Sequence, residues 1–236
     1  MDDSIRVTRL TVNYLAHAYR FLDNPYTVAG VALPDWLSVV GRQYRARRNA
    51  AKTAMANLHQ SDSRADDMDR TLMRAFLQGV IQHHNDDDVF HQNETFILTS
   101  AKFSVALRAI HGPESSIRSG FLGHIIVELL LDDTLSQSNP SLLQEYYRIV
   151  DSLDRTLVCK AASLAVGRDV IGLEKWIDRF VQERFLEDYS DDRRLLGRLN
   201  QIMKRVGLEQ LGEETLAWLE LCREEVSRNA NALLPS

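Results

Sequence analysis

The chain has 236 residues, of which 44% are hydrophobic and 26% are charged, so it can bury a sizeable core without disulfides. Its 28 Lys and Arg against 33 Asp and Glu give a net charge of −5, which argues against general, charge-driven nucleic-acid binding. The two cysteines, Cys159 and Cys222, form no CxxC motif and predict neither a disulfide framework nor a thiolate zinc site. No segment resembles a signal peptide or a membrane span, and we expect a protein of the reducing cytoplasm.

Apolar residues recur at intervals of three and four through most of the chain, which is typical of amphipathic helices. We therefore predict an all-α fold that forms a single domain over residues 1–236. The expected helices are 12–22, 27–41, 45–58, 66–84, 87–111, 116–137, 141–163, 168–187, 191–206 and 209–231. The breaks between helices contain turn residues, as in Asp23-Asn24-Pro25, Ser61-Asp62-Ser63, His111-Gly112-Pro113 and Ser138-Asn139-Pro140.

Two isolated polar residues lie in the first two predicted helices. His17 stands in the segment NYLAHAYRF, where Leu15, Tyr19 and Leu22 indicate an inward face. Asp35 stands in the apolar segment ALPDWL. Burial of an ionisable side chain costs free energy unless the charge is paired, so both residues are candidates for a functional site.

The next segment is locally cationic in this acidic chain. Its positive side chains are Arg42, Arg45, Arg47, Arg48 and Lys52. Such a patch can steer acidic proteins or phosphorylated small molecules toward a surface. The same charges can also form the solvated face of helix 45–58, which is the ordinary role of a basic run. Both interpretations remain open on the sequence.

Three candidate ligands, His83, Asp87 and His91, follow one another at intervals of four residues in GVIQHHNDDDVFHQNE. If this segment is helical throughout, the three side chains share one face. The Asn-Asp-Asp-Asp run could instead end one helix and begin the next, because these residues compete for backbone hydrogen bonds. Either geometry allows the three residues to converge on one ion. For Asp86 and Asp88, exposure to solvent is the ordinary expectation.

Helix 116–137 is apolar around almost its whole circumference, so we expect it to run buried through the centre of the fold. The exceptions, His124, Glu128 and Asp132, are spaced by four residues and form one polar row, which we also expect to be buried. The predicted core consists of Leu122, Ile125, Val127, Leu129, Leu130 and Leu131 with Phe76, Leu77, Val80 and Phe103. Buried carboxylates need a positive partner, so a cation or a metal ion must face the row.

The two polar rows and the two isolated residues together favour a metal site. Imidazole and carboxylate ligands suit Zn²⁺, Mn²⁺ or Fe²⁺, whereas an all-oxygen set would suit Ca²⁺ or Mg²⁺. The alternative is a set of structural ion pairs, with arginines such as Arg74 or Arg118 opposite the carboxylates. Other catalytic motifs are absent from the sequence, including HExxH, GxSxG, the P-loop, GxGxxG and Glu-x-x-His.

Most of these candidates, though not His91 or His124, fall in four short blocks of the chain. In order, the blocks contain Asn13, Leu15, Ala16 and His17; Gly30, Asp35 and Trp36; Gly79, Val80, Ile81, His83 and Asp87; and Glu128, Asp132, Asp133 and Leu135. The blocks resemble those of the acyl carrier protein phosphodiesterase family, helical hydrolases related to the HD-domain metal-dependent phosphohydrolases. The chain departs from the family at three positions. His91 stands in place of a third acidic residue, Glu128 in place of an Asp, and Asp133 in place of a His.

The resemblance implies an HD-like helical core over about residues 12–137, followed by additional C-terminal helices over about 141–231. It also implies a divalent metal such as Mn²⁺ and hydrolysis of a phosphodiester that releases 4′-phosphopantetheine from a carrier protein. On this basis the metal ligands are His17, Asp35, His83, Asp87 and Asp132, with Glu128 and His124 at or next to the ion. Catalytic roles fall to Asp87, His91 and His124, with His91 as the candidate base.

The expected partners are a phosphorylated small molecule or an acidic carrier protein, without nucleic acid or membrane. Because of the three departures from the family pattern, the substrate can differ from that of the family. The competing hypothesis is a non-catalytic helical interaction protein with a degenerate metal site.

Overall fold

The computed structural model of the protein describes residues 13–60, 67–112 and 117–234. Helices joined by turns make up these ranges and no strand occurs in them, so the all-α prediction is confirmed. The α-helices are α1 (Tyr14–Ala18), α2 (Pro25–Val40), α3 (Arg48–Gln60), α4 (Asp67–Gln92), α5 (Glu94–His111), α6 (Ser119–Ser138), α7 (Pro140–Ser152), α8 (Arg155–Val166), α9 (Leu173–Glu183), α10 (Asp192–Val206) and α11 (Leu216–Leu233). Two short 3₁₀ helices are η1 (Phe185–Ser190) and η2 (Glu213–Thr215). Within the described ranges, no helix combines the length and the apolarity needed to cross a membrane.

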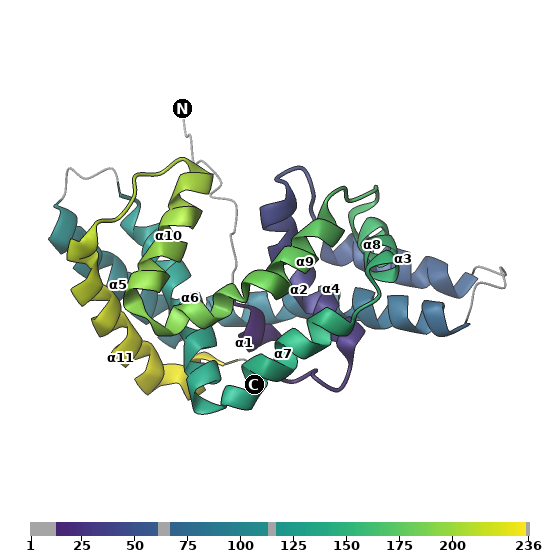
Figure 1. The fold of residues 1–236 in the computed structure, drawn as a ribbon, viewed down its shortest axis with the longest axis horizontal. Coiled ribbons are helices and arrows are strands. Elements are labelled where there is room, and N and C mark those ends of the chain that lie inside the picture. Colours follow the sequence, from purple (N-terminus) through teal and green to yellow (C-terminus); the bar gives the residue numbers. More distant parts are fainter. Residues whose placement is uncertain (1–12, 61–66, 113–116, 235–236) are drawn as a thin grey trace.

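The helices are distributed along one long axis (Figure 1). At one end α11 packs on α5, α6 and α10, and at the other end α3 packs on α4 and α8. Between them α1 contacts both α2 and α6, and α2 packs along α4. One cluster of buried apolar residues extends from Tyr14 in α1 to Leu233 in α11. The four helices that carry the candidate residues, α1, α2, α4 and α6, therefore share one core.

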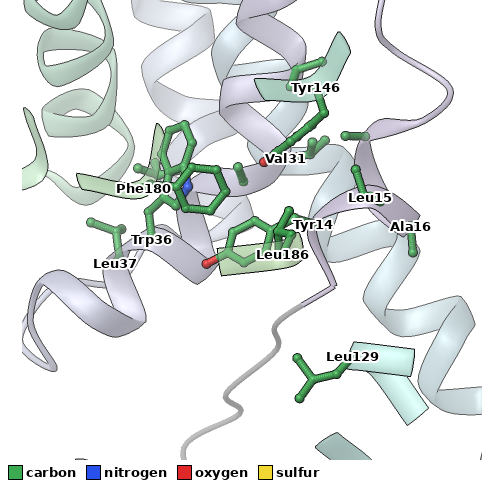
Figure 2. Packing of buried hydrophobic residues seen from close by; sticks show 14 of the residues in the cluster. Tyr14, Leu15, Ala16, Val31, Trp36, Leu37, Leu129, Tyr146, Phe180 and Leu186 are labelled. Carbon is green, nitrogen blue, oxygen red and sulfur yellow. The ribbon is translucent and has the colours of Figure 1, made fainter. Parts of the chain in front are cut away.

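The residues predicted for the core are buried. Leu122, Ile125, Val127, Leu129, Leu130, Leu131, Phe76, Leu77, Val80 and Phe103 are all at most 3% exposed. A second part of the core is aromatic, because the Phe180 ring lies 5.1 Å from Tyr14, 6.1 Å from Trp36 and 6.1 Å from Tyr146 between ring centroids (Figure 2). These edge-to-face contacts hold α1, which has only five residues, against α2, α7 and α9.

α2 and α4 cross at two glycines, Gly30 and Gly79. A Cβ atom on Gly30 would lie 2.0 Å from the carbonyl oxygen of Phe76, and one on Gly79 would lie 2.4 Å from the carbonyl oxygen of Thr27. Backbone atoms cannot yield by such amounts, so these positions require glycine for close approach of the two helices. The crossing brings the backbone of Val31 to the face of α4 that carries the candidate ligands.

Some predicted helix ends differ from those in the structure. α4 continues to Gln92, and α5 begins after Asn93, whose side-chain oxygen accepts the amides of its first turn. The predicted helix 141–163 is divided in the same way, because Asp154 caps the start of α8. Local side-chain caps, which periodicity does not detect, set both boundaries. The predicted break at 61–63 lies outside the described residues.

Candidate metal centre

α4 is helical through the Asn-Asp-Asp-Asp run, so His83, Asp87 and His91 share one face. The neighbouring Asp86 and Asp88 pair with side chains from other parts of the fold and do not cap a new helix. Asp86 lies 2.7 Å from a guanidinium nitrogen of Arg20, which follows α1, and Asp88 contacts Arg48. Of the two geometries that the sequence left open, the structure therefore has the continuous helix.

His17 of α1 meets His83 and Asp87 of α4 in a first group, which we call site 1. Nε2 of His17 is 3.4 Å from Oδ1 of Asp87, and Nε2 of His83 is 3.5 Å from Oδ2 of Asp87. One ligand atom from each side chain lies within 4.8 Å of the other two, and all three residues are buried. Atoms that bind one zinc ion at about 2.0–2.2 Å are themselves about 3.0–3.6 Å apart, so site 1 could hold a metal ion after a small contraction.

The orientation of His83 is set by the backbone of α2. Its Nδ1 lies 2.8 Å from the carbonyl oxygen of Val31. A carbonyl can only accept, so the ring proton is on Nδ1 and a neutral ring carries a lone pair on Nε2. That lone pair faces the Asp87 carboxylate, and two acceptors repel each other unless a cation lies between them. Metal-binding histidines have the same second hydrogen bond to a carbonyl.

His17 lies between two carboxylates. Its Nδ1 is 3.6 Å from Asp86, and its two ring nitrogens make no hydrogen bond within the described part of the chain. Burial would lower the pKa of His17, but Asp86 and Asp87 outweigh it and raise the pKa to about 10. Burial likewise opposes ionisation of both aspartates, yet His17, His83 and Arg20 hold their pKa values below the usual range. Either a proton on His17 or a metal ion can compensate this negative charge.

A second group, which we call site 2, joins α4 to α6. Nε2 of His124 is 3.1 Å and Nε2 of His91 is 3.3 Å from the same carboxylate oxygen of Glu128. Glu128 is fully buried, whereas the His124 side chain is 34% exposed. The prediction of a wholly buried row is therefore wrong for His124. Its ring stacks on His91 and contacts Phe96 at the margin of the core instead of entering it.

The two remaining predicted ligands, Asp35 and Asp132, lie outside both groups of converging ligand atoms. Asp132 accepts a 2.8 Å hydrogen bond from the amide of Ala16, in the first turn of α1. The side chain of Asn13, which precedes α1, makes no capping hydrogen bond. The Asp132 carboxylate accepts a hydrogen bond from the first turn of α1 instead, and so helps to position His17. Burial raises the pKa of Asp132 to about 7 against the effect of the amides. Asp35 is buried in α2, and its charge contributes to the raised pKa of His17.

The cationic segment does not act as one surface. Arg48 donates to the carbonyl oxygen of His84 and contacts Asp88, so it lies against α4. Arg42 donates instead to a carbonyl oxygen of α10. Arg45, Arg47 and Lys52 are exposed. Of the predicted patch, Arg48 is thus the side chain that lies against α4, the helix that contributes residues to both sites.

Sequence reasoning missed two buried ion pairs, Asp86 with Arg20 and Asp133 with Arg223. Asp86 was expected in solvent but is only 4% exposed and pairs with Arg20. Arg20 follows His17 by three residues within the predicted helix 12–22, and this spacing was a usable signal, although α1 itself ends at Ala18. Asp133 is buried in an ion pair with Arg223 of α11. No local pattern indicated that pair, because its members are 90 positions apart.

Comparison of the chain with models of protein families, with curated proteins and with solved structures finds no match. The likeness to the acyl carrier protein phosphodiesterases thus stands on the four sequence blocks. Those blocks lie on or beside α1, α2, α4 and α6. α1, α4 and α6 supply the side chains of sites 1 and 2, and α2 supplies the carbonyl oxygen that contacts His83.

Proposed function

We propose that the protein is a divalent-metal-dependent phosphoester hydrolase whose ion is held by His17, His83 and Asp87. The observation that carries the proposal is the orientation of His83, whose Nδ1 bonds to Val31 while its Nε2 faces Asp87. Two imidazoles and one carboxylate suit Zn²⁺, Mn²⁺ or Fe²⁺. Such an ion, when bound, lowers the pKa of a coordinated water and neutralises charge on phosphoryl oxygens.

Hydrolysis of a phosphoester forms a bond from a water oxygen to phosphorus and breaks the bond from phosphorus to the leaving oxygen. The proton lost by the water is balanced by the proton gained by the leaving group or by solvent. The two groups differ in exposure, because the His124 side chain of site 2 is partly exposed while all three residues of site 1 are buried. Site 2 begins one helical turn after Asp87, about 6 Å along α4.

Support for an anionic substrate comes from Arg48, the cationic side chain of the predicted patch that lies against α4. Arg48 contacts Asp88, the neighbour of Asp87, and Arg47 and Lys52 are exposed on the same segment. Guanidinium groups bind phosphate through paired hydrogen bonds. Together with the four resemblance blocks, this arrangement favours a phosphorylated small molecule or an acidic carrier protein as the substrate class.

The test is a phosphoesterase assay on protein purified without chelator, with and without added Mn²⁺. The substrates are bis-p-nitrophenyl phosphate, p-nitrophenyl phosphate and holo-acyl carrier protein. We expect Asp87→Ala to abolish both hydrolysis and metal retention, because it removes a ligand. The matched control is Asp88→Ala, on the exposed neighbour, which should keep both. Metal-loaded protein inactive on all three substrates would contradict the proposal, as would full activity of Asp87→Ala.

A second candidate function is a non-catalytic helical interaction protein in which these groups are structural ion pairs. The observation that favours it is the position of His17 between Asp86 and Asp87, with a pKa raised to about 10. A protonated His17 alone would then compensate the two carboxylates. Elemental analysis separates the two functions, because this alternative predicts no stoichiometric metal in protein purified without chelator.

A further inference from the structure

Site 2 contains two imidazoles that the proposed hydrolysis does not yet explain. A general base must direct a free lone pair at water or substrate. In the structure, Nε2 of His91 and Nε2 of His124 are both directed at one oxygen of Glu128, at 3.3 and 3.1 Å. His91 is also largely buried, with 12% of its side chain exposed. The geometry is therefore poorer for a base than for a set of converging ligands.

The distances at site 2 match those between neighbouring ligand atoms of one ion. Ligand atoms about 2.0–2.2 Å from zinc are about 3.0–3.6 Å apart, and both nitrogen-to-oxygen distances at site 2 fall within that interval. His124 and Glu128 are four residues apart on α6, so they project from one helical face. His91 closes the set from α4, with its ring stacked on that of His124 at 4.8 Å between centroids.

Charge and burial also favour a cation at this position. Glu128 is fully buried, and ionising it there costs free energy. The carboxylate lies inside the fold beside two imidazoles, with nitrogen-to-oxygen distances of 3.1 and 3.3 Å. A divalent ion held by the three side chains would compensate its charge directly.

We infer that site 2 binds a second divalent transition-metal ion through His91, His124 and Glu128. The inference concerns metal binding and does not depend on the proposed hydrolysis. The His124 side chain is partly exposed, so an ion could enter from solvent, and a set of three protein ligands would leave a coordination position for water. Three protein ligands with an open position are typical of catalytic metal sites, whereas closed sites are structural. The ion of site 2 should consequently exchange faster than an ion at site 1.

The experiment is a metal titration of the full chain after treatment with EDTA. Zn²⁺ is added in excess, unbound ion is removed, and zinc per chain is measured. Two ions are expected for the wild type, and one for His91→Gln and for His124→Gln. His124→Gln is the safer variant for folding, because its side chain is partly exposed. His111→Gln is the matched control, since His111 pairs with Glu214 outside both sites, and it should keep two ions.

Release of the bound ions to EDTA adds a second readout. The wild type should lose zinc in a fast and a slow phase, and His124→Gln should lack the fast phase. Co²⁺ substitution should give visible absorption whose intensity falls by about half in His124→Gln. Circular dichroism confirms that the variant is folded. A folded His124→Gln that retains two ions, or that retains the fast phase, would overturn the inference.

His83→Gln distinguishes failure of this inference from failure of the proposed function. If His83→Gln loses one ion and His124→Gln loses none, site 2 is rejected and site 1 still holds the ion of the hydrolase. If the reverse holds, site 2 is supported and the proposed function loses its ion. If neither variant changes the zinc content, both are rejected.

Discussion

Sites 1 and 2 contain the same types of side chain, two imidazoles and one carboxylate, and lie one turn apart along α4. They differ in surroundings. The three side chains of site 1 are at most 7% exposed, and the backbone of Val31 fixes one ring, whereas at site 2 the His124 ring is 34% exposed. The difference teaches that packing gives the same donor atoms different access to solvent, so we expect an ion to enter and leave site 2 more easily than site 1.

The two sites also differ in what competes with a metal ion. At site 1, Arg20 and a protonated His17 provide positive charge next to Asp86 and Asp87. At site 2, Glu128 lies next to the imidazoles of His91 and His124. A metal ion at site 1 would therefore compete with the charge of Arg20 and with a proton on His17, whose pKa is raised to about 10.

The largest change in stability that we expect concerns Asp133, a buried carboxylate that serves as a comparison for those of sites 1 and 2. Asp133 is buried beside Arg223, without a place in either site. Arg223→Met should lower the free energy of unfolding by about 3 kcal/mol at pH 8, because it leaves a buried charge without its partner. Urea unfolding of both proteins, with and without Zn²⁺, measures this loss of stability. We expect Zn²⁺ not to restore the stability of Arg223→Met, because among the described residues Asp133 has no imidazole ligands beside it. Restored stability would mean that Asp133 does not differ from the carboxylates of sites 1 and 2.

The cost of Arg223→Met should depend on pH. Burial raises the pKa of Asp133 even against the charge of Arg223, and loss of Arg223 raises it further. A raised pKa means that stability is lost as the pH rises through the folded-state value. The difference between wild type and variant should therefore be greatest at high pH and shrink as the pH falls below the folded-state pKa of Asp133 in both proteins, where its carboxyl group is neutral. A cost independent of pH would contradict this.

The next effect is stabilisation by metal. At about 100 times its dissociation constant, Zn²⁺ should add about 2.7 kcal/mol per occupied site, or about 5–10 °C in Tm. His83→Gln should remove the share of site 1, and His124→Gln that of site 2. Thermal unfolding of EDTA-treated protein with increasing Zn²⁺ measures both shares. A Tm that does not respond to Zn²⁺ would show that the two groups are ion pairs.

A smaller effect is expected at the helix crossing. Gly79→Ala places a Cβ against the carbonyl oxygen of Thr27 and should cost about 2 kcal/mol. The separation of α2 from α4 also strains the bond from His83 to Val31, so zinc affinity at site 1 should fall by about 10–100-fold. Affinity at site 2 should not change. Equal losses at the two sites, measured by zinc titration, would mean that they are not independent.

The smallest effect serves as the control for that substitution. Gly120 lies in the first turn of α6, and among the described residues no atom would lie within 4 Å of a Cβ there. Gly120→Ala should therefore raise the free energy of unfolding by about 0.5 kcal/mol, because alanine loses less backbone entropy in a helix. Zinc content and release should stay as in the wild type. A destabilised variant would point to a contact of this turn that the helix geometry does not account for.

The sequence by itself determined the helical class, the buried character of α6 and the residue types of both sites. Periodicity identifies which residues share a face, so Leu122 and Phe76 were placed correctly in the core. It also placed Glu128 among the buried polar residues. His17, His83 and Asp87 were singled out as unusual polar residues before their distances were known.

Only the tertiary structure decided which face meets which. His91 belongs with Glu128, 37 positions away, and Asp132 belongs with the amide of Ala16, 116 positions away. Helical periodicity contains no information on such pairings, because it describes one helix at a time. The pairings depend on how closely helices approach, as at the crossing of Gly30 and Gly79, and this packing separated one predicted ligand set into two sites.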